Sequence, residues 1–346
     1  MNLLPVCIES CLKQTMPIND YEIIIVDDCS TDGTYDMVQS YVTDFPNLIK
    51  GIQLEENSGG CARPRNVGMG MATGEYLFFL DADDTIDERT LEKGYLTGKE
   101  NDSDVVIVSK RNVLNDGSQI KNRTDISLEK SNREGSIFPH IPLDEVQDIL
   151  GHVGHFVRRS SVEKLQLRFN EEIYRIEDTF FLNELLLRTE NAKISGILDK
   201  PYYFYNQNTP LSAHLAAPPE SEEFFKKNAE INVRLWCDLL FGKSKYNIQN
   251  SVYVQSLFKR CLVNRMLKIA RKQPEHFSFL SDILIKKIPQ EADKYIPTSE
   301  AILISALRLN DYEAFVSFDK FSEDFKALKK KVRALRKEIK LLKEKK

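Results

Sequence analysis

The first 110 residues alternate between helical and strand-like hydrophobic patterns. Apolar residues recur at helical spacing from Leu3 to Leu12, and residues 22–26 are then dominated by β-branched side chains, as in a strand buried on both faces. Similar runs predict strands at residues 48–54, 76–80 and 104–108, with helical patterns at 34–43, 65–72 and 88–99. Strands alternating with helices imply right-handed crossovers. The pattern therefore predicts an α/β fold with a mostly parallel sheet flanked by helices, whose ligands bind beyond the carboxyl ends of the strands.

The pattern changes further along the chain. Residues 111–142 are polar and predict loop with short strand pieces, helical spacing returns at 143–189, and residues 194–205 form an aromatic, strand-like segment. After the Ala217-Pro218-Pro219 break the pattern is helical almost to the end. We therefore expect one α/β domain at 1–217, a smaller all-α domain at 218–320 and a separate helix at 321–346.

Composition narrows the class of protein. A length of 346 residues suggests about two domains, and 42% hydrophobic with 29% charged residues excludes wholesale disorder. No apolar run approaches the ~18 residues of a membrane span, and the N-terminus lacks the basic region of a signal peptide. The six cysteines are scattered without a C-x-x-C pair, which favours free thiols in the cytoplasm over disulfides.

Charge is unevenly distributed. Residues 326–346 contain 11 Lys or Arg against 2 Glu, so this segment carries +9 and the rest of the chain −13. An acidic body argues against general nucleic-acid binding by that body. Apolar residues at 321, 325, 328, 332, 335, 339 and 342 follow a heptad seam, which predicts a basic amphipathic helix. Three interpretations stay open: oligomerisation through 321–346, attraction to the inner membrane face or a polyanionic acceptor, and packing on the chain's own helical domain.

Residues that could bind a ligand or take part in catalysis lie where the predicted strands end. Asp27 directly follows the strand at 22–26, in the ligand crevice, although Ser30 or Asp32 there could simply cap the next helix. Asn57-Ser58-Gly59-Gly60 and Arg65 form a flexible loop that enters a helix, a setting suited to a diphosphate. The loop matches neither a P-loop nor a dinucleotide fingerprint.

A second acidic group follows the strand at 76–80. The segment Asp81-Ala82-Asp83-Asp84 places three carboxylates together with no Lys or Arg nearby in the sequence. A site with oxygen ligands alone favours Mg²⁺ or Mn²⁺, which would bridge to substrate phosphates. Glu177-Asp178 opens a later helix, where capping alone would account for the two acids. His152 and His155 lack the further ligands that zinc needs and are expected in the core or an acceptor pocket.

In this order and spacing the motifs resemble the bacterial family 2 glycosyltransferases: V-D-D-x-S-x-D-x-T, then N-x-G and R-N-x-G, then D-A-D-D, then a later E-D. Residues 57–66 are most similar to the enzymes that glycosylate wall teichoic acid polyol-phosphate chains. The resemblance covers roughly residues 1–215 and implies the GT-A fold, with a nucleotide-binding sheet.

The resemblance also implies site roles. Asp27 would hold the uracil of a UDP-sugar with Asn57 and Arg65, Asp81 would contact nucleoside or sugar, and Asp83 would ligate Mn²⁺ or Mg²⁺. Asp178 would be the general base, supported by Glu177, and Ser212 would close on the diphosphate, although the Arg that usually precedes it is replaced by Gln207 and Asn208. The family usually begins with a buried strand that this sequence lacks before its first helix, so we expect the encoded start to lie further upstream.

Together these features predict a metal-dependent, inverting glycosyltransferase. It would move a sugar from a UDP-sugar to a hydroxyl of a polyanionic or lipid-linked cell-surface glycan, such as a polyol-phosphate polymer of teichoic acid or capsule type. Two alternatives stay open: a nucleotidyltransferase of related fold, and an inactive scaffold or binding module. The presence of Asp27, Asp81, Asp83 and Asp178 argues against the inactive form.

Overall fold

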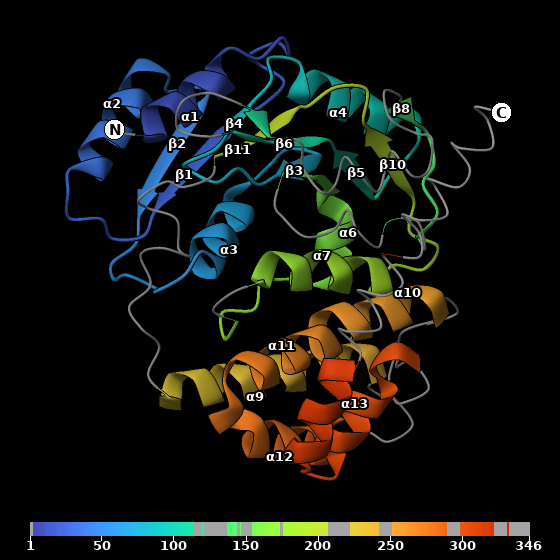
Figure 1. The fold of residues 1–346 in the computed structure, drawn as a ribbon. Helices are drawn as coiled ribbons and strands as arrows, with labels where there is room; N and C mark the ends of the chain where they lie inside the picture. Colours follow the sequence, from blue (N-terminus) through green and yellow to red (C-terminus); the bar gives the residue numbers. More distant parts are fainter. Residues whose placement is uncertain are drawn as a thin grey trace, which may run out of the picture. The chain divides into compact units, whose positions relative to one another are not determined.

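The computed structural model describes residues 3–113, 119–120, 137–143, 146, 154–173, 176–206, 222–241, 251–288, 298–321 and 331. The chain divides into two compact units. The first comprises Met1–Phe224 with Ser244–Asn250, and the second Phe225–Lys243 with Ser251–Lys346. In Figure 1 the described elements of the first unit run from blue to yellow-green and those of the second from dark yellow to red.

The first unit contains short strands and helices in alternation (Figure 1). The strands are β1 (Ile23–Asp27), β2 (Ile49–Gln53), β3 (Tyr76–Phe78), β4 (Thr85–Ile86), β5 (Val105–Val108), β6 (Lys110–Val113), β7 (Gln119–Ile120), β8 (Ile137–Phe138), β9 (Phe156–Arg158), β10 (Ile194–Ile197) and β11 (Tyr203–Asn206). The helices are α1 (Leu3–Leu12), α2 (Thr34–Asp44), α3 (Ala62–Met71), α4 (Thr90–Glu100), α6 (Arg159–Leu165) and α7 (Glu177–Arg188). The strands and helices predicted within the first 110 residues are confirmed to within a few residues.

The described strands form three sheets with the orders β1-β2, β3-β9-β5-β10-β8 and β4-β11-β6-β7. The pairs β1–β2, β5–β10 and β6–β11 are parallel, and the other pairs are antiparallel. The α/β class is confirmed, but the expectation of a mostly parallel sheet is wrong, because the sheets are mixed. The main cause is β9, which lies between β3 and β5 and runs antiparallel to both.

Strand β1 is an edge strand with an unusual exposure. Among the described strands it pairs with β2 alone. Its residues Ile23, Ile24, Ile25 and Val26 are all half-buried, although the run is entirely apolar. Helix α1 packs over this pair through Ile8, which is 2% exposed. On helix α3, Gly68 lies so near Ile24 and Val26 that an added Cβ would be in van der Waals contact with both.

The central part of the first unit is well packed. All four residues of β5 are buried, and Val106 and Val108 join Phe156, Ile197, Tyr202 and Tyr203 in one apolar cluster. Helix α4 approaches this cluster closely: a Cβ added at Gly94 would lie 2.0 Å from the Phe156 ring. In β6 and β11, Lys110 is the register partner of Tyr203. The ends of these strands therefore form a rigid frame beside the turn after β3.

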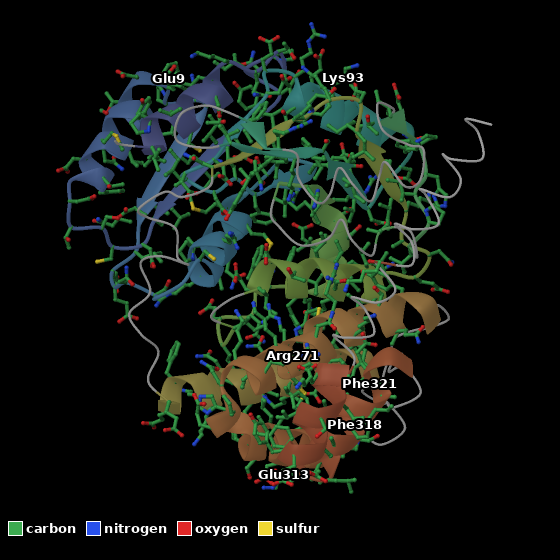
Figure 2. All side chains as sticks on the ribbon, in the orientation of Figure 1. Glu9, Lys93, Arg271, Glu313, Phe318 and Phe321 are labelled. Carbon is green, nitrogen blue, oxygen red and sulfur yellow. The ribbon has the colours of Figure 1, made fainter. Side chains whose placement is uncertain are left out.

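The described part of the second unit is helical (Figure 1). It comprises α9 (Glu222–Phe241), α10 (Ser251–Leu257), the π-helix Phe258–Val263, α11 (Asn264–Lys272), the short 3₁₀ turn Pro274–His276, α12 (Phe277–Lys287) and α13 (Thr298–Arg308), followed by helical residues 312–321. Trp236, Tyr253 and Phe258 are buried in its core. Arg271, labelled in Figure 2, donates to Asp319.

The predicted heptad seam lies mostly outside the described residues. Phe321, its first residue, is 67% exposed, and Phe318 one turn earlier is 43% exposed (Figure 2). Within the described residues, no helix is long and apolar enough to cross a membrane. All six cysteines are free thiols, as predicted.

Candidate active site

The loops after β1 and β2 are tied to each other by side chains. Asp27 is 6% exposed, and its Oδ2 accepts hydrogen bonds from Ser30 N and from Gln53 Nε2, both at 2.9 Å. Asp28 accepts from Ser58 N and Ser58 Oγ at 2.9 Å each. Asn57 donates to the Asp28 carbonyl at 2.8 Å. The structure thus brings Asp27 and Asn57 to the carboxyl end of the β1–β2 pair, as expected for residues that bind one ligand.

The same loop leads into helix α2. The Asp32 carboxylate accepts from Thr34 N at 3.1 Å and from Thr34 Oγ1 at 2.6 Å, at the start of α2. The N-cap position of α2 is Gly33 and makes no side-chain capping bond, so neither Ser30 nor Asp32 is the N-cap; Asp32 instead stabilises the turn that leads into the helix. Asp27 does not cap the helix, because its carboxylate organises the turn instead.

The turn after β3 concentrates carboxylates. Asp84 N donates to the Asp81 carbonyl at 3.0 Å, which closes the turn. Asp84 is 1% exposed and accepts from Tyr203 Oη and, at 2.7 Å, from Asn206 N. Burial, followed by the negative charge of Asp81, raises the pKa of Asp84 to about 8. Asp84 therefore holds this turn against β11, while Asp81 and Asp83 are only half-buried.

Arg65 joins three parts of the first unit. From helix α3, its Nη2 donates to Asp81 at 2.7 Å and its Nη1 donates to Glu177 at 2.6 Å. The Arg65 and Glu177 side chains are 12% and 8% exposed. Cys61 Sγ also donates to Glu177, at 2.8 Å. The guanidinium lies 5.4 Å from the centroid of the Phe169 ring. Arg65 therefore organises the acids at the ends of β3 and α7, a role that the sequence did not indicate.

Glu177 and Asp178 lie in the first turn of α7. The preceding residue, Ile176, has φ 71°, a left-handed conformation that is strained for a β-branched residue. Asp178 Oδ1 accepts from Thr179 N at 2.6 Å. Burial, and then the charge of Glu177, raises the pKa of Asp178 to about 6. Asp178 is thus an acid at a helix N-terminus whose proton affinity suits a base near neutral pH.

A small cavity adjoins Asp178. Three aromatic rings and His155 contribute to its wall, which consists of Phe79, Gly154, His155, Val157, Phe169, Asp178, Phe181 and Leu182. Phe169 and Phe181 stack with their ring centroids 4.2 Å apart. His155 Nδ1 accepts from Val108 N at 3.1 Å, so His155 belongs to the core and pocket wall, as expected. The cavity has about 20 Å³ for the centre of a water-sized sphere, which is enough for a water molecule.

Lys110 brings a second cation to the acids. It is 2% exposed, and its Nζ lies 5.3 Å from the centroid of the Tyr203 ring. Burial lowers the pKa of Lys110 to about 7, while the charges of Asp178, Asp81 and Asp84 oppose that shift. The sequence Ser109-Lys110-Arg111-Asn112 has the composition of a surface turn, so sequence reasoning missed this residue.

The donors present fit a hard divalent cation. Asp81 Oδ1 accepts from Arg65, and both oxygens of Asp84 accept hydrogen bonds, so these two acids of the turn are engaged within the protein. Mg²⁺ and Mn²⁺ commonly take one or two protein carboxylates and complete their shell with substrate phosphates and water. Within the described residues, no group of three His, Cys, Asp or Glu is arranged to hold a metal ion.

The structure thus gathers Arg65, Asp81, Glu177 and Asp178 at one place, and Asp27 with Asn57 at the end of the neighbouring β1–β2 pair. Ser212 lies outside the described residues, as do His152 and His214.

Comparison with known proteins finds relatives and a match to a family model over part of the chain. Residues 2–165 match the family model described as glycosyl transferase family 2. The poly(ribitol-phosphate) beta-N-acetylglucosaminyltransferase TarP of Staphylococcus aureus (strain N315) is 29% identical over 319 residues, covering 90% of this chain and 93% of TarP. A poly(ribitol-phosphate) beta-glucosyltransferase of Bacillus spizizenii is 26% identical over 94% of this chain, which spans about half of that relative (49%).

A solved structure matches the fold. The crystal structure of S. aureus TarS 1–349 in complex with UDP-GlcNAc superposes with a TM-score of 0.73 at 23% identity, covering 93% of this chain and 88% of the TarS chain. The expected GT-A-like fold with a helical C-terminal region is therefore confirmed.

Proposed function

We propose that the protein, whose residues 2–165 match the glycosyl transferase family 2 model, is an inverting glycosyltransferase. It moves a sugar from a UDP-sugar to a hydroxyl of a polyol-phosphate polymer of the teichoic acid type. The observation that carries the proposal is the meeting of Asp178, Glu177, Arg65 and Asp81, which come from segments up to 112 residues apart. The two relatives, both named as poly(ribitol-phosphate) transferases, support the substrate class.

Asp178 is the general base in this proposal. Its Oδ1 accepts the Thr179 N–H, and its Oδ2 takes the proton of the acceptor hydroxyl as that oxygen attacks the anomeric carbon. The bond from this carbon to the diphosphate oxygen breaks, and UDP leaves from the opposite face with inversion. Arg65 forms ion pairs with Glu177, the neighbour of Asp178, and with Asp81 in the turn after β3. These ion pairs keep Asp178 and that turn in a fixed position relative to each other.

Asp83 would hold a Mn²⁺ or Mg²⁺ ion. A bound cation would neutralise the negative charge of the diphosphate, a common role of metals in group transfer. Asp27 and Asn57 bind the uracil and ribose in this proposal, since both lie beyond the carboxyl ends of β1 and β2. Ser212 would contact the diphosphate.

The basic segment has a separate role in this proposal. Residues 321–346, for which the sequence predicts a basic amphipathic helix, would attract an anionic acceptor at the inner face of the cytoplasmic membrane and associate through the heptad seam. The charge of this segment, +9 over residues 326–346, supports the attraction to an anionic acceptor.

The test combines two substitutions with two assays. Asp178→Asn keeps the shape of the side chain and removes its basicity, so polymer glycosylation should fall by ~10² or more while UDP affinity stays the same. Asp36→Asn, in the first turn of α2, is the matched control and should leave both unchanged. Full transfer by Asp178→Asn, or no transfer by the wild type from any UDP-sugar to a polyol phosphate, would refute the proposal.

A further inference from the structure

Asn66 is the second residue of the R-N-x-G motif and makes a contact that its own helix does not explain. It lies in the interior of α3, directly after Arg65. Helix interiors disfavour asparagine, because its side chain competes for backbone hydrogen bonds. Here the side chain instead reaches Phe169, 103 residues further along the chain. The long-range contact, rather than local preference, accounts for an asparagine at this position.

The Asn66 side chain pairs with the backbone of Phe169 as one peptide group pairs with another. Its Nδ2 donates to the Phe169 carbonyl at 2.9 Å, and its Oδ1 accepts from Phe169 N at 2.8 Å. Nδ2 also donates to Glu171 Oε1, at 2.9 Å. Residues 167–173 form neither helix nor strand, so their backbone groups need partners from elsewhere in the chain. Asn66 provides a partner for both backbone groups of Phe169.

The ring that Asn66 fixes in this way is the centre of an aromatic trio, Phe79, Phe169 and Phe181. The Phe169 ring stacks on that of Phe181 with centroids 4.2 Å apart, and it meets the Phe79 ring edge-on at 5.0 Å. Phe79 lies two residues before Asp81, in the segment that follows β3. Phe181 lies three residues after Asp178, on α7. The aromatic trio therefore packs the segment after β3 against the first turns of α7.

Arg65 and Asn66 hold the same stretch of chain at its two ends. Asn66 binds the backbone of Phe169, and Arg65 Nη1 donates at 2.6 Å to Glu177, the residue before Asp178. The Arg65 guanidinium also lies 5.4 Å from the centroid of the Phe169 ring. Two consecutive residues of α3 thus anchor both ends of residues 169–177, the segment that leads to Asp178.

We propose that Asn66 is a positioning residue for the transfer reaction: by pairing with the Phe169 backbone it fixes the aromatic trio, which in turn orients the first turn of α7 and the Asp178 carboxylate. This inference rests on the proposed function, in which Asp178 is the base. Phe169 and Asp178 line the same small cavity, so a displaced ring changes the space beside the carboxylate. A displacement of a reacting group by about 1 Å can lower a rate by about 10²-fold.

The test removes the side-chain amide and leaves the helix. Asn66→Ala removes both bonds to Phe169, and Asn66→Ser is a second variant whose side chain is too short to reach both backbone groups. The matched control is Asn101→Ala, because Asn101 is also half-buried and donates its side-chain amide to a backbone carbonyl, that of Thr97 at 2.8 Å, but at the end of α4. Glu171→Gln is a second control, which keeps an oxygen that can accept from Asn66 and removes only the charge.

Both Asn66 variants should lower kcat by about 10–100-fold, while the KM for UDP-sugar and the Kd for UDP stay within about twofold of the wild type. Asn101→Ala and Glu171→Gln should keep the wild-type kcat. All rates are measured well below the melting temperature of each variant, so that the folded fraction is the same. An unchanged kcat, or a loss that appears in KM or in UDP affinity instead of kcat, would overturn the assignment.

Amide hydrogen exchange follows the same contact without turnover. Asn66→Ala should make exchange of the Phe169 N–H about tenfold faster, should also accelerate exchange in the first turn of α7, and should leave α4 unchanged. Unchanged exchange at Phe169, or faster exchange confined to residues 167–173, would overturn the positioning role. If the wild type transfers no sugar, the proposed function fails, whereas the exchange rates still decide whether Asn66 holds Phe169 and α7 in place.

Discussion

Removal of the Arg65 charge should destabilise the first unit by a predictable amount. Arg65→Met leaves Glu177, which is 8% exposed, without its cation and leaves Asp81, which is 35% exposed, with only solvent. Breaking a buried ion pair at one partner costs roughly 3–5 kcal/mol, and the partial exposure of Asp81 favours the lower end. We therefore expect a loss of about 3 kcal/mol in the free energy of unfolding.

Three further variants test the origin of this loss. Arg65→Lys keeps the charge but lacks the forked geometry that reaches two carboxylates, so about half of the loss should remain. Arg65→Met with Glu177→Gln removes one of the stranded charges and should recover part of the stability. Arg63→Met is the matched control on the same helix, because Arg63 pairs with Glu56 at the surface, and should resemble the wild type.

The assay is urea unfolding followed by far-UV circular dichroism. With a slope of roughly 2–3 kcal/mol per M, a loss of about 3 kcal/mol lowers the midpoint by about 1–1.5 M. Trp236 is the single tryptophan and lies buried in the second unit, so its fluorescence follows that unit separately. If Arg65→Met unfolds at the wild-type urea concentration, Arg65 does not tie α3, β3 and α7 together.

Four other predictions follow from the same structure. The pKa of Asp178 is raised to about 6, and the base must be ionised, so kcat should fall about tenfold between pH 7 and pH 5, and a flat profile would contradict the assignment. Asp83→Ala should lower Mn²⁺-stimulated transfer by ~10² or more while the melting temperature is kept, and full activity of the wild type in excess EDTA would rule out a metal role. Gly94→Ala should destabilise the fold by about 1–3 kcal/mol because its Cβ would overlap Phe156, whereas Gly70→Ala, with open space around it, should be neutral or stabilising in thermal denaturation. Deletion of residues 321–346 should leave UDP-sugar hydrolysis unchanged and weaken transfer to polymer at low salt, and equal polymer transfer by the truncated protein would exclude an acceptor-binding role.

The sequence predicted those elements whose hydrophobic pattern is long enough to show a period. Strands β1 and β2 and helices α2, α3 and α4 each span at least five residues, and their predicted positions are close to the observed ones. Strand β9 has three residues and β4 two, which is too short for a periodic pattern. Because β9 lies between β3 and β5, missing this one strand led to the wrong expectation of a mostly parallel sheet.

The candidate site was predictable as a set of acids but not as a network. Asp27, Asp81, Asp83 and Asp178 follow strands or open a helix, which local pattern reveals. Glu177, the partner of Arg65 on α7, lies 112 residues away in the sequence. A pattern that spans a few residues cannot reveal a contact between residues so far apart in the chain. Lys110 was missed for a related reason: its burial depends on β11, which comes from a distant part of the chain. Polar residues that become buried only through long-range pairing resemble surface residues in the sequence.

The edge position of β1 has a consequence for how the protein behaves in concentrated solution. In a parallel pair, alternate residues direct their N–H and C=O groups to the partner, and the residues between them direct theirs to the opposite side. Ile23 N bonds to the Leu48 carbonyl and Leu54 N to the Asp27 carbonyl, so the peptide groups of Ile24 and Val26 face the side away from β2. Edge strands usually carry a lysine, a proline or a bulge that discourages further pairing, and Ile-Ile-Ile-Val has none of these. Within the described fold, β1 therefore carries none of these safeguards against the addition of another strand, whether from a peptide or from a neighbouring molecule, and a charged residue introduced at Ile24 would supply one.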